Sequence, residues 1–394
     1  MKKAIVLAGA TVLLITFSSI FYYKNVDFSN GQGEIKKKND LSYVELPKYE
    51  DVKDVSESKE DEKKSWFSGL FDKKDNNESE ESISKNEEGN KVPEKDISIC
   101  NENGKIMILM YHKFAETQSD GWTRSFDNFR KDLQTLYDKN YYPINMTDYL
   151  NGYIDVPYGK TPVILTFDDG TAGQLSFERI DGKLVPKENT AVAIYKKFSE
   201  EHSDFPMRGT FYIMSTNFFG STGTLRQRLE YLVGQGFEIG NQTKNHYALQ
   251  KATSAEKVIE EVGGLAKFVD ELIPGYVINS FSIPGGSMTK NYKEQVYSGT
   301  YDGFKYENKG VVLLYGSSPE LSPINKELNL KSLSRVRVAG KDKVDKDFDY
   351  WIKYFDEHLE EKFVSDGDPM TFVVNKEDSD KVQISSQYNL KTKN

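Results

Sequence analysis

The chain has 394 residues and a formal net charge of -9, with 29% charged residues and a mean hydropathy of -0.62. Because no basic face is concentrated anywhere, the charge argues against a nucleic-acid partner. The single cysteine, Cys100, excludes an internal disulfide and a multi-cysteine metal site. Histidine-dependent chemistry can draw only on His112, His202, His246 and His358.

Residues 1–24 predict a membrane segment. Lys2 and Lys3 precede an uncharged run over residues 4–23 that is long enough to cross a bilayer as a helix. This pattern is typical of a signal peptide or a signal anchor. The aromatic end of the run and the lack of a small-x-small cleavage site favour an uncleaved, single-pass anchor in the cell membrane. The leading lysines predict that the rest of the chain is on the extracellular face, although further lysines after the run weaken this orientation.

Residues 25–100 have the composition of a charged, disordered linker, because they contain too few apolar residues to form a core. One apolar island, residues 65–71, interrupts the linker. This island either contacts a membrane surface or a partner, or is an apolar patch without a role, and the sequence leaves both interpretations open. Residues 101–394 form the predicted globular domain.

Within that domain, strands and helices alternate, which predicts an α/β fold with a parallel sheet, open or closed as a barrel. Strands are expected over residues 106–111, 163–167, 209–214, 237–240, 276–283, 311–315, 335–338 and 371–374, and helices over residues 126–136, 190–201, 225–233, 255–272 and 348–363.

The strand over 163–167 runs directly into Asp168, Asp169 and Gly170. Two adjacent carboxylates at the end of a buried strand are costly unless a metal or a shared proton uses them. Asp-Asp-Gly is also good turn chemistry, so the pair alone leaves a functional site and a simple turn open.

Other strand ends also carry polar or glycine-rich residues. His112 follows the first strand, residues 240–246 follow another, and Pro284-Gly285-Gly286 follows a third. In parallel α/β folds these ends meet on one face, where active sites lie. Their convergence favours the functional interpretation of the two aspartates.

The motifs resemble those of a known family. Thr166-Phe167-Asp168-Asp169-Gly170 is similar to the first motif of the polysaccharide deacetylases of the NodB-homology type, carbohydrate esterase family 4. Met110-Tyr111-His112, Gly209-Thr210-Phe211-Tyr212 and Glu238-Ile239-Gly240-Asn241, followed by a threonine and a histidine, resemble the same family in the same order. The resemblance covers roughly residues 106–374.

The resemblance implies a distorted (β/α)7 barrel of the NodB-homology type that hydrolyses N-acetyl groups of N-acetylglucosamine polymers with a divalent metal, commonly zinc. It implies that Asp168 is the general base and that Asp169 and His246 are metal ligands. These residue types suit the reaction, because a metal acidifies water and polarises the acetyl carbonyl while a carboxylate takes the proton.

The chain also departs from the family pattern. Gln242 stands where the family has its first metal histidine, and an amide oxygen is a poorer zinc ligand than imidazole. Ser282 stands where the family has an arginine that orients the base. The family's late histidine has no clear counterpart, because His358 lies in a charged helical stretch that favours the surface.

Several residues are candidates to replace what is missing. His112 is either the general acid or a metal neighbour, or else a partly buried structural histidine. Arg335 is either a partner for Asp168 or half of a surface ion pair. The backbone N–H of Gly285 suits an oxyanion. Tyr247, beside His246, is the favoured aromatic for sugar stacking, although aromatic residues near the motifs more often belong to a core.

Two functions follow. The first is a membrane-anchored polysaccharide deacetylase, a hydrolase of carbon-nitrogen bonds other than peptide bonds, acting on a cell-wall or surface polysaccharide such as peptidoglycan. The second is a catalytically impaired pseudo-deacetylase that binds glycan or an envelope partner. Asp168, Asp169 and His246 favour the first, whereas Gln242 and Ser282 favour the second.

Overall fold

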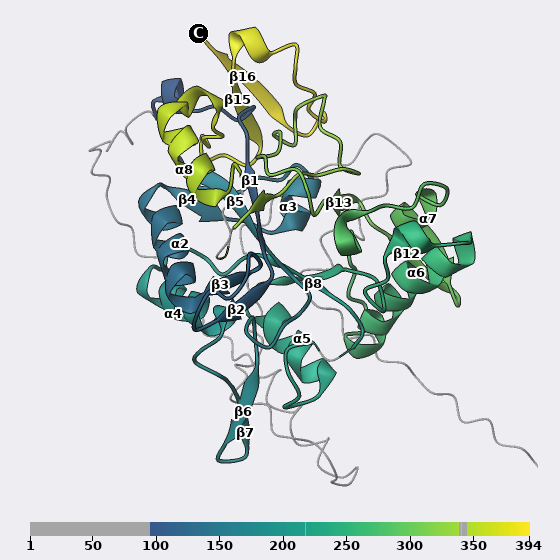
Figure 1. Cartoon of the computed structure of the whole chain (residues 1–394). Helices are drawn as coiled ribbons and strands as arrows, with labels where there is room; N and C mark the ends of the chain where they lie inside the picture. The colour runs from purple at the N-terminus through teal and green to yellow at the C-terminus, as the bar shows by residue number, and fades with distance from the viewer. Residues whose placement is uncertain (1–94, 217, 339, 341–344) are drawn as a thin grey trace, which may run out of the picture.

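The computed structural model describes residues 95–394 apart from 217, 339 and 341–344 (Figure 1). The predicted anchor, the apolar island and nearly all of the predicted linker lie outside the described residues. In the described part, no helix is long and apolar enough to span a membrane.

The main sheet is built from short parallel strands, as the alternating pattern predicts. In spatial order its strands are β13 (Gly310–Val312), β10 (Ser280–Ser282), β9 (Glu238–Asn241), β8 (Thr210–Ile213), β5 (Thr161–Asp168), β1 (Met107–Tyr111) and β14 (Val336–Arg337), and β4 (Tyr141–Pro143) pairs with β5. The central strand β5 is buried along its whole length, and this explains its continuous apolar sequence.

Helices join the strands and cover the sheet (Figure 1). They are α2 (Phe126–Asp138), α3 (Met146–Leu150), α4 (Ala191–Glu201), α5 (Leu225–Gly234), α6 (Ala255–Leu272), α7 (Glu294–Tyr297) and α8 (Phe348–Glu357). Side-chain caps define several of their starts. Thr224 and Gln227, for example, form a reciprocal capping box at the beginning of α5.

Four two-stranded sheets are also present among the described residues. They pair β2 (Lys113–Ala115) with β3 (Thr123–Ser125), β6 (Phe177–Ile180) with β7 (Lys183–Pro186), β11 (Ser298–Tyr301) with β12 (Phe304–Glu307), and β15 (Thr371–Asn375) with β16 (Asn389–Lys393). The β15–β16 pair lies at one end of the molecule and the β6–β7 hairpin extends from the other (Figure 1).

Most predicted elements are present, but three differ from expectation. The strand expected over 276–283 contains only β10, and the helix expected over 348–363 ends at Glu357. The strand predicted over 371–374 is outside the main sheet, because β15 pairs with β16. Among the described residues, the edge strands β13 and β14 do not pair with each other, so the sheet is incompletely closed. Val312 of β13 instead forms a bridge with Leu333, three residues before β14 begins.

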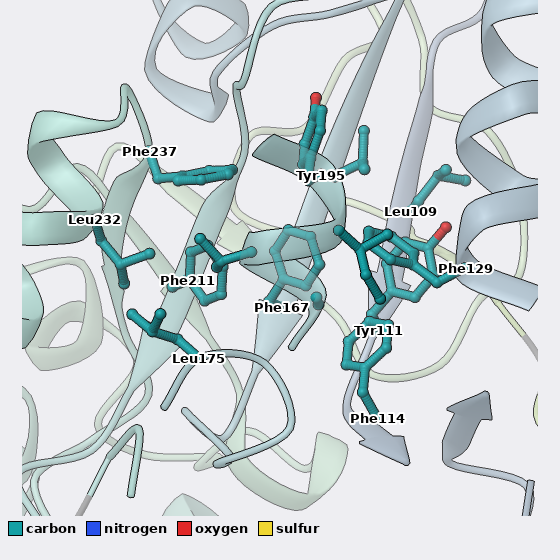
Figure 2. Packing of buried hydrophobic residues seen from close by; sticks show 14 of the residues in the cluster. Leu109, Tyr111, Phe114, Phe129, Phe167, Leu175, Tyr195, Phe211, Leu232 and Phe237 are labelled. Carbon is teal, nitrogen blue, oxygen red and sulfur yellow. The ribbon is translucent and has the colours of Figure 1, made fainter. Parts of the chain in front are cut away.

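Aromatic side chains fill the core between β1, β5, β8 and the surrounding helices (Figure 2). Phe167 stacks on Phe211 with ring centroids 4.5 Å apart, and Tyr111 stacks on Phe167 at 5.5 Å. Burying a side chain of this size stabilises a fold by about 1.5–3 kcal/mol. The packed core therefore fixes the strand that ends at Asp168.

Candidate active site

Asp168, the last residue of β5, forms a buried ion pair with Arg335. The carboxylate is 1% exposed and the arginine side chain is 0% exposed. Nη1 of Arg335 donates to Oδ1 of Asp168 at 2.6 Å, and Nη2 donates to Oδ2 at 2.8 Å. Arg335 thus occupies the role that the arginine missing at position 282 would have, and the pair is not on the surface.

The remaining donors of Arg335 are also used. Nε donates to the carbonyl of Leu313 at 2.8 Å, and Nη1 to Oγ1 of Thr166 at 3.1 Å. Nη2 donates to Oγ of Ser282 at 3.2 Å, and this hydroxyl donates to Oδ2 of Asp168 at 3.0 Å. The fork of five N–H groups is therefore fully bonded, which makes Asp168 one member of a rigid network.

His112 lies against the same carboxylate from the end of β1. Its Nε2 is 3.8 Å from Oδ2 of Asp168, and its side chain is 11% exposed. Burial lowers the pKa of His112 even though Asp168 and Asp169 act in the opposite direction. At neutral pH, the imidazole is therefore uncharged and able to accept a proton.

Trp122 holds the other side of His112. The two rings have centroids 4.6 Å apart, and the guanidinium of Arg337 lies 3.7 Å from the Trp122 ring centroid. Gln174, which follows the two aspartates, donates to the carbonyls of both His112 and Asp168. These contacts fix the ends of β1 and β5 relative to each other.

Asp169 points to a different set of partners. Its Oδ1 lies 3.5 Å from Nε2 of His246, and Nε2 of Gln242 donates to the same oxygen at 3.0 Å. Oε1 of Gln242 in turn accepts the backbone N–H of Asp169 at 2.9 Å. Gln242 lies in the site, as the resemblance implies, but its amide is bonded to both the backbone N–H and the carboxylate of Asp169.

The contact between Asp169 and His246 changes the pKa values of both side chains. Burial alone raises the pKa of Asp169, but the hydrogen bond with His246 and the nearby histidine charges lower it overall. The hydrogen bond with Asp169 raises the pKa of His246. The two side chains therefore stabilise each other as an imidazolium and a carboxylate.

The backbone at this site is strained. Asp169, Thr243 and His246 have φ values of 75°, 63° and 51°, in the left-handed region that non-glycine residues rarely adopt. Such conformations cost on the order of 1–3 kcal/mol each and persist where the surroundings hold them. Gly285, with φ 64°, has nothing within 4 Å of the position of a Cβ, which leaves open space beside its backbone.

The aromatic residues suggested by the sequence are mostly unavailable to a ligand. Tyr212, Phe218 and Phe219 are buried in the core. Tyr247 is half-buried, and the ammonium of Lys257 lies 5.2 Å from its ring centroid. The exposed aromatic on this edge of the sheet is one that the sequence did not single out.

That residue is Tyr315, whose side chain is 63% exposed. It follows β13, and its ring lies so close to Gly286 that a Cβ on that glycine would meet Cε2 of the tyrosine at 2.4 Å. The carbonyl of nearby Leu313 accepts a hydrogen bond from Arg335. Tyr315 is therefore connected to the Asp168 network through short stretches of chain.

The other two histidines lie elsewhere in the fold. His202 ends α4 and packs on Tyr137 with ring centroids 4.2 Å apart. His358 ends α8 and stacks on Tyr354 at 4.1 Å. Both side chains pack against tyrosine rings at helix ends, away from Asp168 and Asp169. The histidines at the site are therefore His112 and His246.

The donor set fits a divalent cation in part. Asp169 and His246 bring a carboxylate oxygen and an imidazole nitrogen together, which are suitable zinc ligands. No cluster of three or more histidine, cysteine or acidic side chains that would suit a metal is found in the described ranges. Gln242 as a third ligand stays a prediction, because its amide is hydrogen-bonded to Asp169.

Residues 155–303 match the family model described as polysaccharide deacetylase. This match confirms the resemblance drawn from the motifs. The match covers a little more than a third of the chain and includes Asp168, Asp169, Gln242 and His246. Arg335 and His112 both lie outside the matched segment.

Solved structures to which the chain is similar include one described as the putative polysaccharide deacetylase BA0330 from Bacillus anthracis, at 18% identity and a TM-score of 0.47 over 61% of this chain and 67% of that one. A Streptococcus pyogenes deacetylase in complex with acetate has 21% identity and a TM-score of 0.46 over 60% and 93%. A Bacillus cereus polysaccharide deacetylase has 18% identity and a TM-score of 0.46 over 63% and 69%. No curated protein matches the chain.

Proposed function

We propose that the protein is a metal-dependent deacetylase that hydrolyses N-acetyl groups of a cell-wall or surface polysaccharide of the N-acetylglucosamine type. The observation that carries this proposal is the buried, doubly bonded ion pair between Asp168 and Arg335 beside His112. A catalytic base must be held in a fixed orientation, and the two hydrogen bonds from Arg335 hold Asp168 in this way beside His112.

In the proposed reaction, a water attacks the acetyl carbonyl carbon, the bond from that carbon to nitrogen breaks, and acetate and an amine leave. Asp168 takes one proton of the water through Oδ1, which accepts one hydrogen bond, from Arg335, whereas Oδ2 accepts two, from Arg335 and Ser282. His112, uncharged at rest, receives this proton from Asp168, whose Oδ2 lies 3.8 Å from its Nε2, and delivers it to the leaving nitrogen. The backbone N–H of Gly285 stabilises the developing oxyanion.

Asp169 and His246 are the residues that would hold the divalent cation, with zinc as the first candidate and Gln242 as a further oxygen donor if its amide turns. When bound, such a cation supplies Lewis acidity to a water and to the carbonyl. The membrane anchor over residues 1–24 would keep the domain at the extracellular face, where such polysaccharides lie.

A second candidate is a pseudo-deacetylase that binds glycan without turnover. It is favoured by the amide of Gln242, which contacts the same Asp169 oxygen as His246 and competes with a cation for it. The exposed ring of Tyr315 would serve a glycan-binding protein equally well.

The test is acetate release from N-acetylglucosamine oligomers and from peptidoglycan by protein stripped with a chelator and reloaded with zinc, cobalt or manganese. Release that depends on the added metal supports the deacetylase. Binding of the oligomers without acetate release under any metal supports the pseudo-deacetylase.

A further inference from the structure

The segment that carries His246 is held in place by a buried carboxylate on a neighbouring helix. Glu261 lies within α6 and is 1% exposed. Its Oε2 accepts the backbone N–H of Asn245 at 3.0 Å, and its Oε1 accepts Nδ2 of the same asparagine at 3.0 Å. Both oxygens of this buried group thus bind the residue directly before His246.

The backbone of α6 adds to this attachment. The carbonyl of Glu261 accepts the N–H of Lys244 at 2.7 Å, and the carbonyl of Val262 accepts Nδ2 of Asn241 at 2.8 Å. Lys257, one turn earlier on the helix, places its ammonium 2.9 Å from Oε1 of Glu261. A buried carboxylate is tolerated when it is paired and hydrogen-bonded in this way.

The segment needs such support because its own conformation is unfavourable. Thr243 and His246 both have positive φ, and neither is a glycine. Local bonds within the segment run from Thr243 to Asn241 and from Tyr247 to Thr243, so they shape the turn but do not attach it to the fold. The carbonyl of Lys244 accepts the N–H and the hydroxyl of Ser215, at 2.9 and 2.7 Å, and Glu261 attaches Asn245, the residue directly before His246.

We infer that Glu261 is a positioning residue, which sets the His246 ring against Asp169 and thereby tunes the affinity for a divalent cation. Supporting residues of metal ligands commonly change metal affinity by about 10- to 100-fold when they are removed. The placement of the segment follows from the contacts alone, whereas the consequence for the cation rests on the proposed function.

The test uses Glu261→Gln, which keeps the shape of the side chain but leaves one acceptor oxygen for two donors on Asn245. Glu260→Gln is the matched control, since Glu260 also binds Lys257, at 3.0 Å, but is 43% exposed. Two quantities are measured for each protein: amide hydrogen exchange over residues 243–247 without metal, and the dissociation constant for zinc by calorimetry.

We expect Glu261→Gln to accelerate exchange over residues 243–247 and to raise the zinc dissociation constant by about tenfold or more, while Glu260→Gln leaves both at the wild-type values. Equal exchange and equal zinc binding in the two variants would overturn the inference. If Glu261→Gln does not fold, Asn245→Ala, which changes only the segment, is expected to show both effects more weakly, and wild-type values there would overturn the inference too.

The exchange measurement requires neither metal nor substrate. Faster exchange in Glu261→Gln together with an absence of acetate release from the wild type would support the positioning role and count against the deacetylase. Metal-dependent acetate release by the wild type, together with unchanged exchange and zinc binding in Glu261→Gln, would support the deacetylase and count against the positioning role.

Discussion

Arg335 binds both carboxylate oxygens of Asp168, although the two residues are 167 positions apart in the chain. In the family motif, this arginine stands at the position that Ser282 occupies here. In this chain it is the residue directly before β14, the strand that pairs with β1. Because the pair is buried, removing one partner leaves an uncompensated charge in the interior. The pair therefore links the stability of the fold to the geometry of the proposed base.

Arg335→Ala should lower the free energy of unfolding by about 3–5 kcal/mol, measured by denaturant titration, and should abolish acetate release. Arg335→Lys keeps the charge but not the two-pronged contact, so both losses should be smaller. Arg130→Ala removes an exposed ion pair with Asp127 and serves as the control. An Arg335→Ala protein as stable as this control would contradict the role assigned to the pair.

The sequence predicted β5, its acidic end and the gathering of strand ends, because these features depend on local apolar patterns and on the general geometry of parallel sheets. It left the role of Arg335 open, since a contact across 167 positions has no local signal. It singled out Tyr247 and gave no sign of the exposed Tyr315, because exposure depends on packing that a sequence pattern does not contain.

Glu261 was missed for a related reason. It belongs to an amphipathic helix in which a glutamate ordinarily marks the exposed face, and only the fold shows that this one faces Asn245. The strand over 371–374 was placed in the main sheet by its apolar sequence, but β16 supplies a separate partner.

Gln242→His should raise zinc affinity, because an imidazole replaces an amide whose oxygen and nitrogen are both bonded to Asp169. The zinc dissociation constant measured by calorimetry is expected to fall by about tenfold or more, comparable to other changes around metal ligands. Unchanged affinity would show that position 242 is outside the coordination shell.

Zinc binding should weaken as the pH falls. The imidazole of His246 must lose its proton to bind a metal, and its pKa is raised by the hydrogen bond with Asp169. Binding measured between about pH 5 and 8, the range in which histidines titrate, should therefore improve as the pH rises through the pKa of His246. A pH-independent dissociation constant would exclude His246 as a ligand.

Tyr315→Ala should raise KM for N-acetylglucosamine oligomers more than it lowers kcat, because an exposed ring beside the site contributes binding to the sugar face. Tyr315→Phe should retain most of that binding. Tyr350→Ala on α8, where the tyrosine is 42% exposed, is the control. Equal KM values for Tyr315→Ala and the wild type would show that the ring does not contact substrate.

Glu102 makes stability depend on pH. Burial raises its pKa to about 8, although the backbone N–H groups of Val373 and Asp366 act in the opposite direction. The folded state therefore keeps a proton that the unfolded chain, with the ordinary pKa of 4.5, has released. The free energy of unfolding should fall as the pH rises from about 4.5 to about 8.

Glu102→Gln should remove this part of the slope, whereas Glu327→Gln, at an exposed position, should preserve it. Denaturant titrations at several pH values measure the difference. A Glu102→Gln protein with the slope of the wild type would mean that Glu102 ionises normally in the fold.

The most direct test of the proposed function is acetate release from N-acetylglucosamine oligomers with added zinc, comparing the wild type with Asp168→Asn. The asparagine keeps the size of the side chain and removes the base. Release by the wild type and a loss of release in Asp168→Asn are the predicted results. Equal release by the two proteins would contradict the assignment of Asp168 as the catalytic base.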